Sequence, residues 1–336
     1  MKAAIQTRHQ TDRTILKDVL PIDTPFAIGI WTGDVCNLKC KYCVQALSND
    51  KFRKTHAVKN FLSWDIFERI AEQISEFPIP IKTVAFSATA GEPLMNKNLT
   101  NMIRRLKETN KVKTITMFTN GLLLTKRKSL ELIDSGLDRI NISLQGINSE
   151  AYKQMCGADI DIQKLQDNFK FLYENKKQCH IFMKTLDICL KEGEEKLFYD
   201  MFGNYCDTIY INNAVRLYQG LDYTGVISEA KGVYNAISNK HDVCSMSFYS
   251  IYTQADGCIT PCCTMPFPID FGNVTGTTLY SAFNGEKRRK FLLMMLERKR
   301  HNHPTCGSCI APDNGIICKE DDLDPYAEEL RHKFLK

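Results

Sequence analysis

The chain has 336 residues, of which 43% are hydrophobic and 25% charged, and its formal net charge is +5. This composition suits a folded protein with a sizeable core. No apolar run approaches the roughly 20 residues of a membrane-spanning helix. The modest net charge argues against a nucleic-acid partner. Residues 1–9 lack the apolar core of an export signal, and fourteen cysteines in an unexported chain favour metal chemistry over disulfides, so we expect a cytoplasmic protein that binds no membrane.

From residue 26 onward, short β-branched runs alternate with amphipathic runs, which predicts a parallel α/β sheet. Ser63 fits an N-cap and Gly136 fits a C-cap of two of the expected helices. Six strand–helix units are too few for the eight of a closed barrel. The expected strands cover 26–31, 83–87, 114–118, 139–144, 180–188 and 208–212, and the expected helices cover 64–77, 97–108, 125–135, 160–175 and 194–202.

After about residue 215 the pattern changes to that of a small cysteine-bearing module. Residues 247–253 alternate like a strand, Asp256 and Gly257 can make a turn, and residues 258–263 can return as a second strand. A basic stretch over 287–301 with an apolar centre predicts an amphipathic helix with a solvated basic face. The alternative is a landing site for an anionic substrate or partner.

The most informative feature is a loop with three closely spaced cysteines directly after the first expected strand. Cys36, Cys40 and Cys43 have C-x3-C-x2-C spacing. Three thiolates can hold three irons of a [4Fe–4S] cluster and leave the fourth iron open, whereas a structural zinc takes four ligands. The alternatives are a structural zinc loop and chance clustering.

This loop resembles the signature of the radical S-adenosylmethionine (radical SAM) enzymes. The resemblance implies that SAM chelates the open iron through its amino and carboxylate groups. It implies that the reduced cluster cleaves SAM to methionine and a 5′-deoxyadenosyl radical, which abstracts a hydrogen atom from the substrate. It also implies a partial (β/α)6 TIM-like barrel as the core fold, with Tyr42 packed near the adenine of SAM.

A second segment, after the second expected strand, matches the same family. Gly91, Glu92 and Pro93 resemble the family's glycine–glutamate–proline motif, which binds the amino group of SAM. An ammonium group calls for a carboxylate and carbonyls, and a glycine lets the backbone approach closely. Ala90 stands where the family commonly has another glycine.

Polar residues at the ends of later strands complete the implied SAM site. Asn120, Ser143 and Gln145 resemble segments that line the methionine and ribose parts of SAM, although the family often has aspartate at the position of Gln145. Lys184 could form a salt bridge with the SAM carboxylate, and the alternative is an exposed lysine at a strand end. Arg216 is a candidate for a substrate phosphate or carboxylate, and the alternative is an exposed arginine.

A second cysteine set lies in the C-terminal region. Its last two members form C-x2-C, and four thiolates from separated loops make a closed [4Fe–4S] or zinc site. The order resembles the SPASM and shorter "twitch" extensions of radical SAM enzymes, which hold auxiliary [4Fe–4S] clusters. Only Cys318 follows the C-x2-C pair, where a complete SPASM domain has three further cysteines, so the resemblance implies one auxiliary cluster. The set is Cys244, Cys262, Cys306 and Cys309.

The other cysteines have no assigned role in these two centres. Cys263 is an alternative ligand to Cys262, and Cys258 is an unassigned extra. We expect the remaining four to be buried free thiols, with the alternative that one of them donates a hydrogen atom in a radical epimerisation. These four are Cys156, Cys179, Cys189 and Cys206.

The resemblance implies four regions: an N-terminal extension (1–25), a radical SAM partial barrel (26–220), a SPASM- or twitch-like domain (221–320) and a charged tail (321–336). It implies an oxidoreductase that acts on a small polar substrate, such as a sugar, cyclitol or nucleotide-linked sugar, and takes electrons from a flavodoxin- or ferredoxin-type donor. A peptide maturase is the alternative, although the first 25 residues are too short for a peptide-recognition domain. An alternative from another class is a non-catalytic iron–sulfur or zinc protein.

Overall fold

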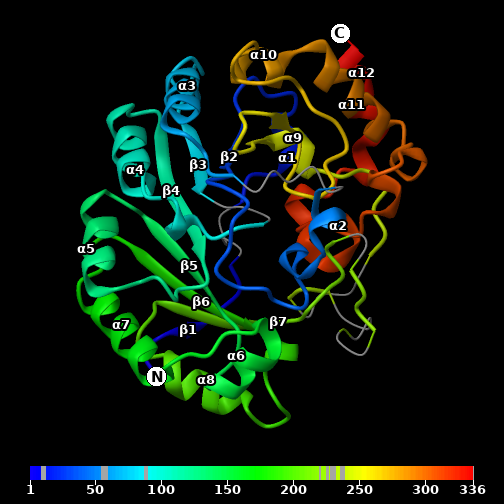
Figure 1. Ribbon diagram of the computed structural model, residues 1–336. Coiled ribbons are helices and arrows are strands. Elements are labelled where there is room, and N and C mark those ends of the chain that lie inside the picture. Colours follow the sequence, from blue (N-terminus) through cyan, green and yellow to red (C-terminus); the bar gives the residue numbers. More distant parts are fainter. Residues whose placement is uncertain are drawn as a thin grey trace.

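The computed structural model describes residues 1–8, 13–53, 60–86, 90–218, 221–224, 227, 232–234 and 239–335. Its central feature is a nine-stranded open sheet in the order β1-β7-β6-β5-β4-β3-β2-β8-β9, in which only β8 and β9 pair antiparallel (Figure 1). The strands are β1 (Ala4–Ile5), β2 (Ala27–Ile30), β3 (Ile81–Phe86), β4 (Val112–Thr119), β5 (Arg139–Leu144), β6 (His180–Leu186), β7 (Thr208–Asn212), β8 (Ser250–Thr253) and β9 (Ile259–Thr260).

The six expected strands are confirmed as β2 to β7, and the helices that connect them cover one face of the sheet (Figure 1). The sheet does not close, as expected for a partial barrel. Ser63 caps its helix by accepting a hydrogen bond from the Ile66 N–H. Ser87, expected in the second strand, lies outside the described residues. The connecting helices are α3 (Trp64–Ile74), α4 (Leu99–Glu108), α5 (Lys126–Asp134), α6 (Ser149–Cys156), α7 (Ile162–Glu174) and α8 (Glu195–Phe202).

The sheet is wider than the six expected strands because segments from both ends of the chain extend it. β1 pairs with β7, and β8 pairs in parallel with β2. Without β8, the backbone edge of β2 would be left unpaired. A glycine makes this pairing close: a Cβ added at Gly29 would lie 2.1 Å from the Tyr252 ring. The C-terminal module is therefore joined directly to the barrel sheet.

Two details of the expected C-terminal strands are wrong. Ser247 to Tyr249 belong to the short helix α9 (Met246–Tyr249), so the strand begins only at Ser250. The return strand covers Ile259 and Thr260 alone, since Pro261 has no N–H to continue the ladder. Half of residues 221–240, at the start of the expected SPASM- or twitch-like domain, lie outside the described residues.

The basic stretch forms helix α11 (Glu286–Leu296), but its basic face is not wholly solvated. Arg288 is only 5% exposed, and its guanidinium lies 3.6 Å from the Phe283 ring centroid. It donates hydrogen bonds to the carbonyls of Phe283, Ser247 and Phe248. The expectation of a solvated face is therefore wrong at Arg288, which ties α11 to α9.

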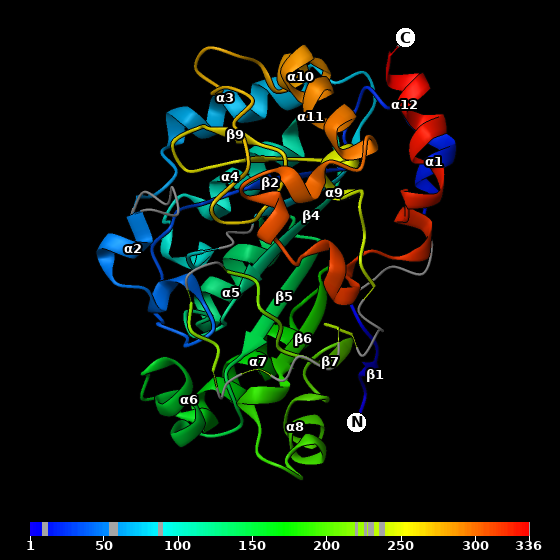
Figure 2. The same cartoon turned by 90° about the vertical axis from the view of Figure 1, so that its right-hand side faces the viewer.

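Both ends of the chain carry packed structure. The last segment forms α12 (Ala327–Leu335), which buries Leu330. The N-terminal helix α1 (Leu16–Val19) lies against this C-terminal segment, where the Lys17 ammonium is 4.8 Å from the Tyr326 ring centroid (Figure 2). The remaining helices are α2 (Asn49–Arg53) and α10 (Leu279–Asn284). None of the helices in the described ranges is long and apolar enough to cross a membrane.

Candidate active site

The cysteine loop after β2 is braced by helix α6, which the sequence did not predict. The backbone N–H groups of Lys39 and Lys41 donate to the carbonyls of Cys156 and Met155, at 3.3 and 3.0 Å. These carbonyls lie at the end of α6, where they have no partner within the helix. Gly157 ends the helix in a left-handed conformation, with φ +72°. The loop geometry therefore depends on a helix more than 100 residues away in sequence.

The three thiols of this loop sit in surroundings that disfavour a bare negative charge. Burial raises the pKa of Cys36 to about 12, and it raises the pKa of Cys43 as well. The pKa of Cys40 is raised by its hydrogen bond with Cys156 and by burial. Without a nearby cation these thiols stay protonated at neutral pH, whereas metal binding would stabilise the thiolates. Three sulfur donors in one half-buried loop thus fit the open-iron cluster.

The glycine–glutamate–proline segment packs directly against this loop. The Glu92 N–H donates to the Val35 carbonyl at 2.8 Å. Gly91 has φ +107°, and a Cβ added there would lie 2.1 Å from the Gly33 carbonyl oxygen. Only glycine fits such a conformation and approach. The motif therefore holds the backbone that leads into Cys36.

The carboxylate of Glu92 is buried and already accepts three hydrogen bonds. Its donors are the Thr119 hydroxyl at 2.6 Å, the Asn120 N–H at 2.8 Å and the Leu94 N–H at 3.1 Å. Burial raises the pKa of Glu92 to about 7, against the opposing effect of these donors. Glu92 thus joins the ends of two strands, and its contact with a SAM ammonium stays a prediction.

Four of the other expected SAM-site residues meet beside the cysteine loop at the carboxyl ends of β4 and β5, whereas Lys184 lies on β6. The Asn120 amide donates to the Asn37 side-chain oxygen at 2.8 Å and lies 3.9 Å from the Cys36 sulfur. The Tyr42 hydroxyl donates to the Gln145 side chain, whose amide donates to the Ser143 carbonyl at 3.1 Å. Tyr42 therefore fixes the loop to the end of β5.

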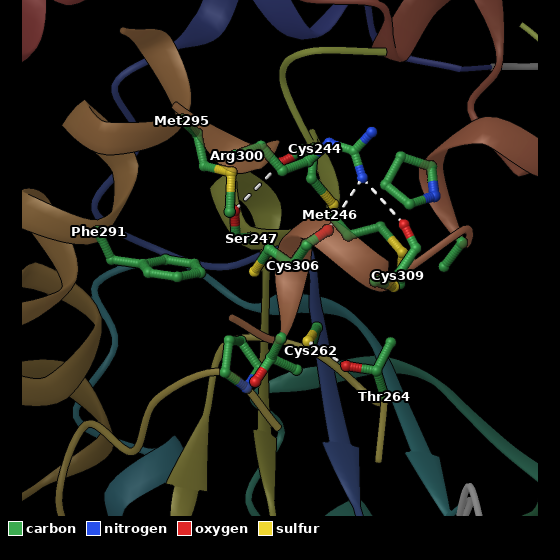
Figure 3. Close-up of a pocket in the computed structure, with 14 residues that line it drawn as sticks. Cys244, Met246, Ser247, Cys262, Thr264, Phe291, Met295, Arg300, Cys306 and Cys309 are labelled. Atoms are coloured by element: carbon green, nitrogen blue, oxygen red, sulfur yellow. Dashed lines mark hydrogen bonds between the residues drawn. The ribbon is translucent and has the colours of Figure 1, made fainter. Parts of the chain in front are cut away.

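The second cysteine set surrounds one cavity (Figure 3). Figure 3 shows Cys262 on one side of it and the other three cysteines across from it. Met246, Phe291 and Met295 supply apolar walls. Burial raises the pKa of Cys244 and of Cys306 to about 12. Four soft donors around one enclosed, apolar space fit a closed iron–sulfur site. The cysteines are Cys244, Cys262, Cys306 and Cys309.

The unassigned cysteines stand apart from this cavity. Cys262 lines it and Cys263 does not; Cys263 instead lies near the hydroxyls of Tyr218 and Tyr252. Cys258 and Cys318 do not line it either. The four cysteines expected to be buried free thiols are so in the structure: Cys156, Cys179, Cys189 and Cys206.

Arg300 holds the backbone of the second cysteine set. Its side chain is 1% exposed and donates to the carbonyls of Cys306 and Cys309 at 3.2 and 2.9 Å. It also donates to the His241 carbonyl at 2.9 Å and to both Asp313 carboxylate oxygens. In the sequence it belongs to the basic stretch, where nothing distinguishes it from its solvated neighbours.

A cavity of about 300 Å³ lies beside both cysteine centres. Cys309 lines this cavity and the cavity of the second cysteine set. Tyr218 also lines it and hydrogen-bonds Cys43, which lowers the pKa of that thiol against the larger effect of burial. Arg216, the expected substrate contact, is part of the wall, together with Thr264, Thr305 and Ser308.

Comparison with known families matches the two regions of the chain that contain these centres. The radical SAM superfamily model matches residues 32–187, and the SPASM model, an iron–sulfur cluster-binding domain, matches residues 244–310. The chain belongs to the radical SAM superfamily. It is an iron–sulfur enzyme: its radical SAM domain takes a [4Fe–4S] cluster and SAM, and its SPASM domain takes an auxiliary iron–sulfur cluster.

Curated relatives of this radical SAM enzyme are similar over part of their length. A GTP 3′,8-cyclase of Limosilactobacillus fermentum is 27% identical over 220 residues, which cover 66% of this chain and 61% of that protein. A GTP 3′,8-cyclase of Staphylococcus aureus is 36% identical over 129 residues, which cover 38% of this chain and 36% of that protein. The chain thus spans less than two thirds of the length of these relatives.

Solved structures share the fold at low sequence identity. BtrN in complex with AdoMet and 2-DOIA has a TM-score of 0.56 and 16% identity, and covers 89% of this chain and 96% of its own. AnSMEcpe with bound AdoMet has a TM-score of 0.56 and 15% identity, and covers 92% of this chain and 96% of its own. These similarities establish an open α/β barrel with a C-terminal extension.

Proposed function

We propose that this radical SAM enzyme oxidises a small polar substrate, such as a sugar, a cyclitol or a nucleotide-linked sugar, with the auxiliary cluster as electron acceptor. The observation that carries this proposal is the cavity beside both cysteine centres. A molecule in it would touch Cys309, a proposed ligand of the auxiliary cluster. It would also touch Tyr218, the hydrogen-bond partner of Cys43.

The size and the walls of the cavity suit a small polar molecule. A volume of about 300 Å³ is at the lower end of the range for small-molecule sites. Arg216 supplies a cation, and Thr264, Thr305 and Ser308 supply hydroxyl groups that can donate to or accept from a polyol. Leu217, Met265 and Ile310 supply apolar surface.

The residues of the chain would bind the cofactors, orient them and exclude water. Cys36, Cys40 and Cys43 are the proposed ligands of the SAM-binding cluster, which when bound supplies the electron for cleavage of SAM. Tyr42 and Gln145 join the loop to the sheet, and so fix the place where SAM would sit. A flavodoxin- or ferredoxin-type protein is the proposed electron donor.

The names of some similar proteins agree with a small polar substrate, whereas AnSMEcpe was also crystallised with the Cp18Cys peptide. The curated relatives are named for a reaction of GTP, and BtrN was crystallised with 2-DOIA. SuiB of Streptococcus suis, with a TM-score of 0.52 for its complex with S-adenosylmethionine, supports the fold only. These names motivate a screen of sugars, cyclitols and nucleotide sugars.

Isotope transfer in the anaerobically reconstituted enzyme tests the proposal. In a net oxidation, one substrate hydrogen atom goes to the 5′-deoxyadenosyl radical, one electron goes to the auxiliary cluster and one proton goes to solvent. Deuterium at the target carbon should therefore appear in 5′-deoxyadenosine, and unlabelled substrate should give a product two mass units lighter. Cys309→Ala should still form 5′-deoxyadenosine but should give no oxidised product.

Other outcomes would reject this reading in distinct ways. A product of unchanged mass that gains solvent deuterium would indicate epimerisation. A crosslinked peptide product would establish the peptide-maturase alternative. Stoichiometric zinc in place of about eight irons, with no SAM cleavage, would leave only the non-catalytic metal protein.

A further inference from the structure

Three cations share the face of the sheet that the connecting helices do not cover. On β5, Ile140, Ile142 and Leu144 belong to the core under the helices, so Arg139 and Ser143 face the other side. Lys184 of β6 is the pairing partner of Ser143, and therefore shares that face. The third cation is Arg8, whose guanidinium lies 5.1 Å from the ring centroid of Phe118 on β4.

The strand register places two aromatic rings under these cations. Phe118, Asn141 and Phe182 are partners across β4, β5 and β6, and so form one row of the sheet. The Arg139 guanidinium lies 5.6 Å from the Phe182 ring centroid, one pair of positions below Lys184. Aromatic faces attract cations but do not neutralise them.

Arg8 repels both Arg139 and Lys184, and none of the three cations has a carboxylate partner in the described part of the chain. Burial and, to a smaller extent, the charge of Arg8 lower the pKa of Lys184 to about 8. The pKa of Arg139 is lowered by burial and then by Arg8. The side chain of Arg139 does contact the Asn141 oxygen at 3.3 Å, but among described residues none of the three makes an ion pair.

The carboxylate of Asp207, directly before the adjoining strand β7, is already engaged. Asp207 pairs with Lys176 at 2.9 Å and accepts a hydrogen bond from the Ile181 N–H. It lies 4.0 Å from the His180 ring, and His180 is the pairing partner of Arg139. Burial and the charge of Arg139 lower the pKa of His180, so the histidine stays neutral at pH 7 and adds no further positive charge.

We infer that Arg8, Arg139 and Lys184 bind the phosphate group of a small phosphate ester. Like charges gathered without a counter-ion are costly, and a bound dianion would relieve that cost. Two guanidinium groups offer forked donors that match phosphate oxygens, and the lysine offers a point charge. The site lies next to the SAM site, because Ser143, the partner of Lys184, is two residues from Gln145.

A carboxylate, including that of SAM, is the other anion that such cations can bind. The probes are therefore methyl phosphate, acetate and SAM, each titrated at constant ionic strength into the anaerobically reconstituted full chain. The variants are Arg8→Gln, Arg139→Gln, the double variant and Lys184→Gln. The matched control is Arg127→Gln, because Arg127 is 80% exposed on α5 and, among the described residues, its one ion pair is with Glu131.

We expect methyl phosphate to bind saturably, and each single arginine variant to weaken its binding about tenfold, which is about 1.4 kcal/mol. The double variant should lose about a hundredfold, and SAM binding and 5′-deoxyadenosine formation should stay within twofold of wild type. The anion-free Arg8→Gln variant should melt at a higher temperature than wild type, because one repulsive charge is gone. A merely structural role of Arg8 would instead lower the melting temperature.

Four results would overturn the inference. The first is that methyl phosphate does not bind saturably, and the second is that acetate binds with the same affinity as methyl phosphate. The third is that Arg127→Gln weakens methyl phosphate binding as much as the Arg8 and Arg139 variants do. The fourth is that Lys184→Gln loses SAM binding but keeps methyl phosphate binding. The proposed function is tested separately: it fails if no 5′-deoxyadenosine forms, whether or not methyl phosphate binds.

Discussion

Replacement of Arg300 by glutamine should destabilise the auxiliary centre far more than the same change at a neighbouring arginine. The Arg300 side chain is 1% exposed and donates to three carbonyls and to the Asp313 carboxylate. Two of those carbonyls belong to Cys306 and Cys309, so the guanidinium fixes the backbone that presents both thiols. Glutamine is shorter, carries no charge and cannot reach all these acceptors.

The size of the stability loss follows from the buried carbonyls and the carboxylate that would lose their hydrogen-bond donor. Removal of one partner of a buried, hydrogen-bonded ion pair costs about 3–5 kcal/mol, because the other groups keep their desolvation cost without their partner. Asp313 is 21% exposed and also accepts from the His241 N–H, which reduces the loss. We therefore expect a loss of about 3 kcal/mol in the free energy of unfolding. Arg300→Lys should recover little of it, because an ammonium cannot fork between carbonyls and carboxylate.

Arg298→Gln is the control, since Arg298 is 51% exposed and its ion pair with Asp242 is at the surface. Such a pair contributes about 0–1 kcal/mol. The assay is urea unfolding of the metal-free chain under reducing conditions, so that cluster binding does not add to the stability of the folded state. Iron analysis after reconstitution should then find about four irons per chain in Arg300→Gln, those of the SAM-binding cluster. Equal shifts of the urea midpoint in the Arg300 and Arg298 variants would refute this reasoning.

Three further predictions concern the SAM-binding centre. Replacement of the three cysteines after β2 by alanine should abolish 5′-deoxyadenosine formation under strong reductant and leave about four irons in the auxiliary site; formation that persists would reject the ligand set. Gly91→Ala should displace the cysteine loop, because the added Cβ would lie 2.1 Å from the Gly33 carbonyl oxygen. Iron analysis should therefore find that this variant loses iron from the SAM-binding centre. The control Gly276→Ala should keep its iron, because a Cβ added there meets no atom within 4 Å. Burial raises the pKa of Glu92 to about 7 from an ordinary 4.5, so the folded chain holds a proton that the unfolded chain releases. The stability that this proton provides should be complete below about pH 4.5 and lost by about pH 7, so the free energy of unfolding should fall by roughly 3 kcal/mol over this range. Urea unfolding at a series of pH values should show that this fall is absent in Glu92→Gln. Parallel pH profiles of the wild type and the variant would contradict the prediction.

Local patterns in the sequence were sufficient for the parallel core of the fold. The strands β2 to β7 are β-branched runs between amphipathic helices, and their alternation specifies parallel pairing whatever the rest of the chain does. The cysteine loop after β2 could likewise be predicted from the sequence, because its three cysteines lie within eight consecutive residues. The strand that pairs with the edge of β2 could not be predicted from the sequence, because β8 lies more than 200 residues later. Its pairing depends on tertiary contacts such as that of Tyr252 with Gly29.

The buried arginines show why the rest of the site could not be read in the same way. Arg288 and Arg300 stand in a run of basic residues, where charge predicts exposure. They are buried because backbone carbonyls from α9 and from the Cys306–Ser308 turn converge on them, which is a property of tertiary structure alone. The choice between Cys262 and Cys263 has the same character. Cys262 is the ligand expected from the sequence and Cys263 is the alternative, and the fold supports Cys262, because Cys262 lines the cavity and Cys263 does not.

The walls of the proposed substrate cavity favour the proposed oxidation over epimerisation. An epimerase that returns a hydrogen atom from a thiol needs a free cysteine beside the substrate radical. Among the described residues that line this cavity, Cys309 is the sole cysteine, and it is a proposed ligand of the auxiliary cluster. Cys263 lies near Tyr218 but does not line the cavity. A substrate radical formed there would therefore meet an electron acceptor before it met a hydrogen donor, and oxidation is the outcome that this arrangement favours.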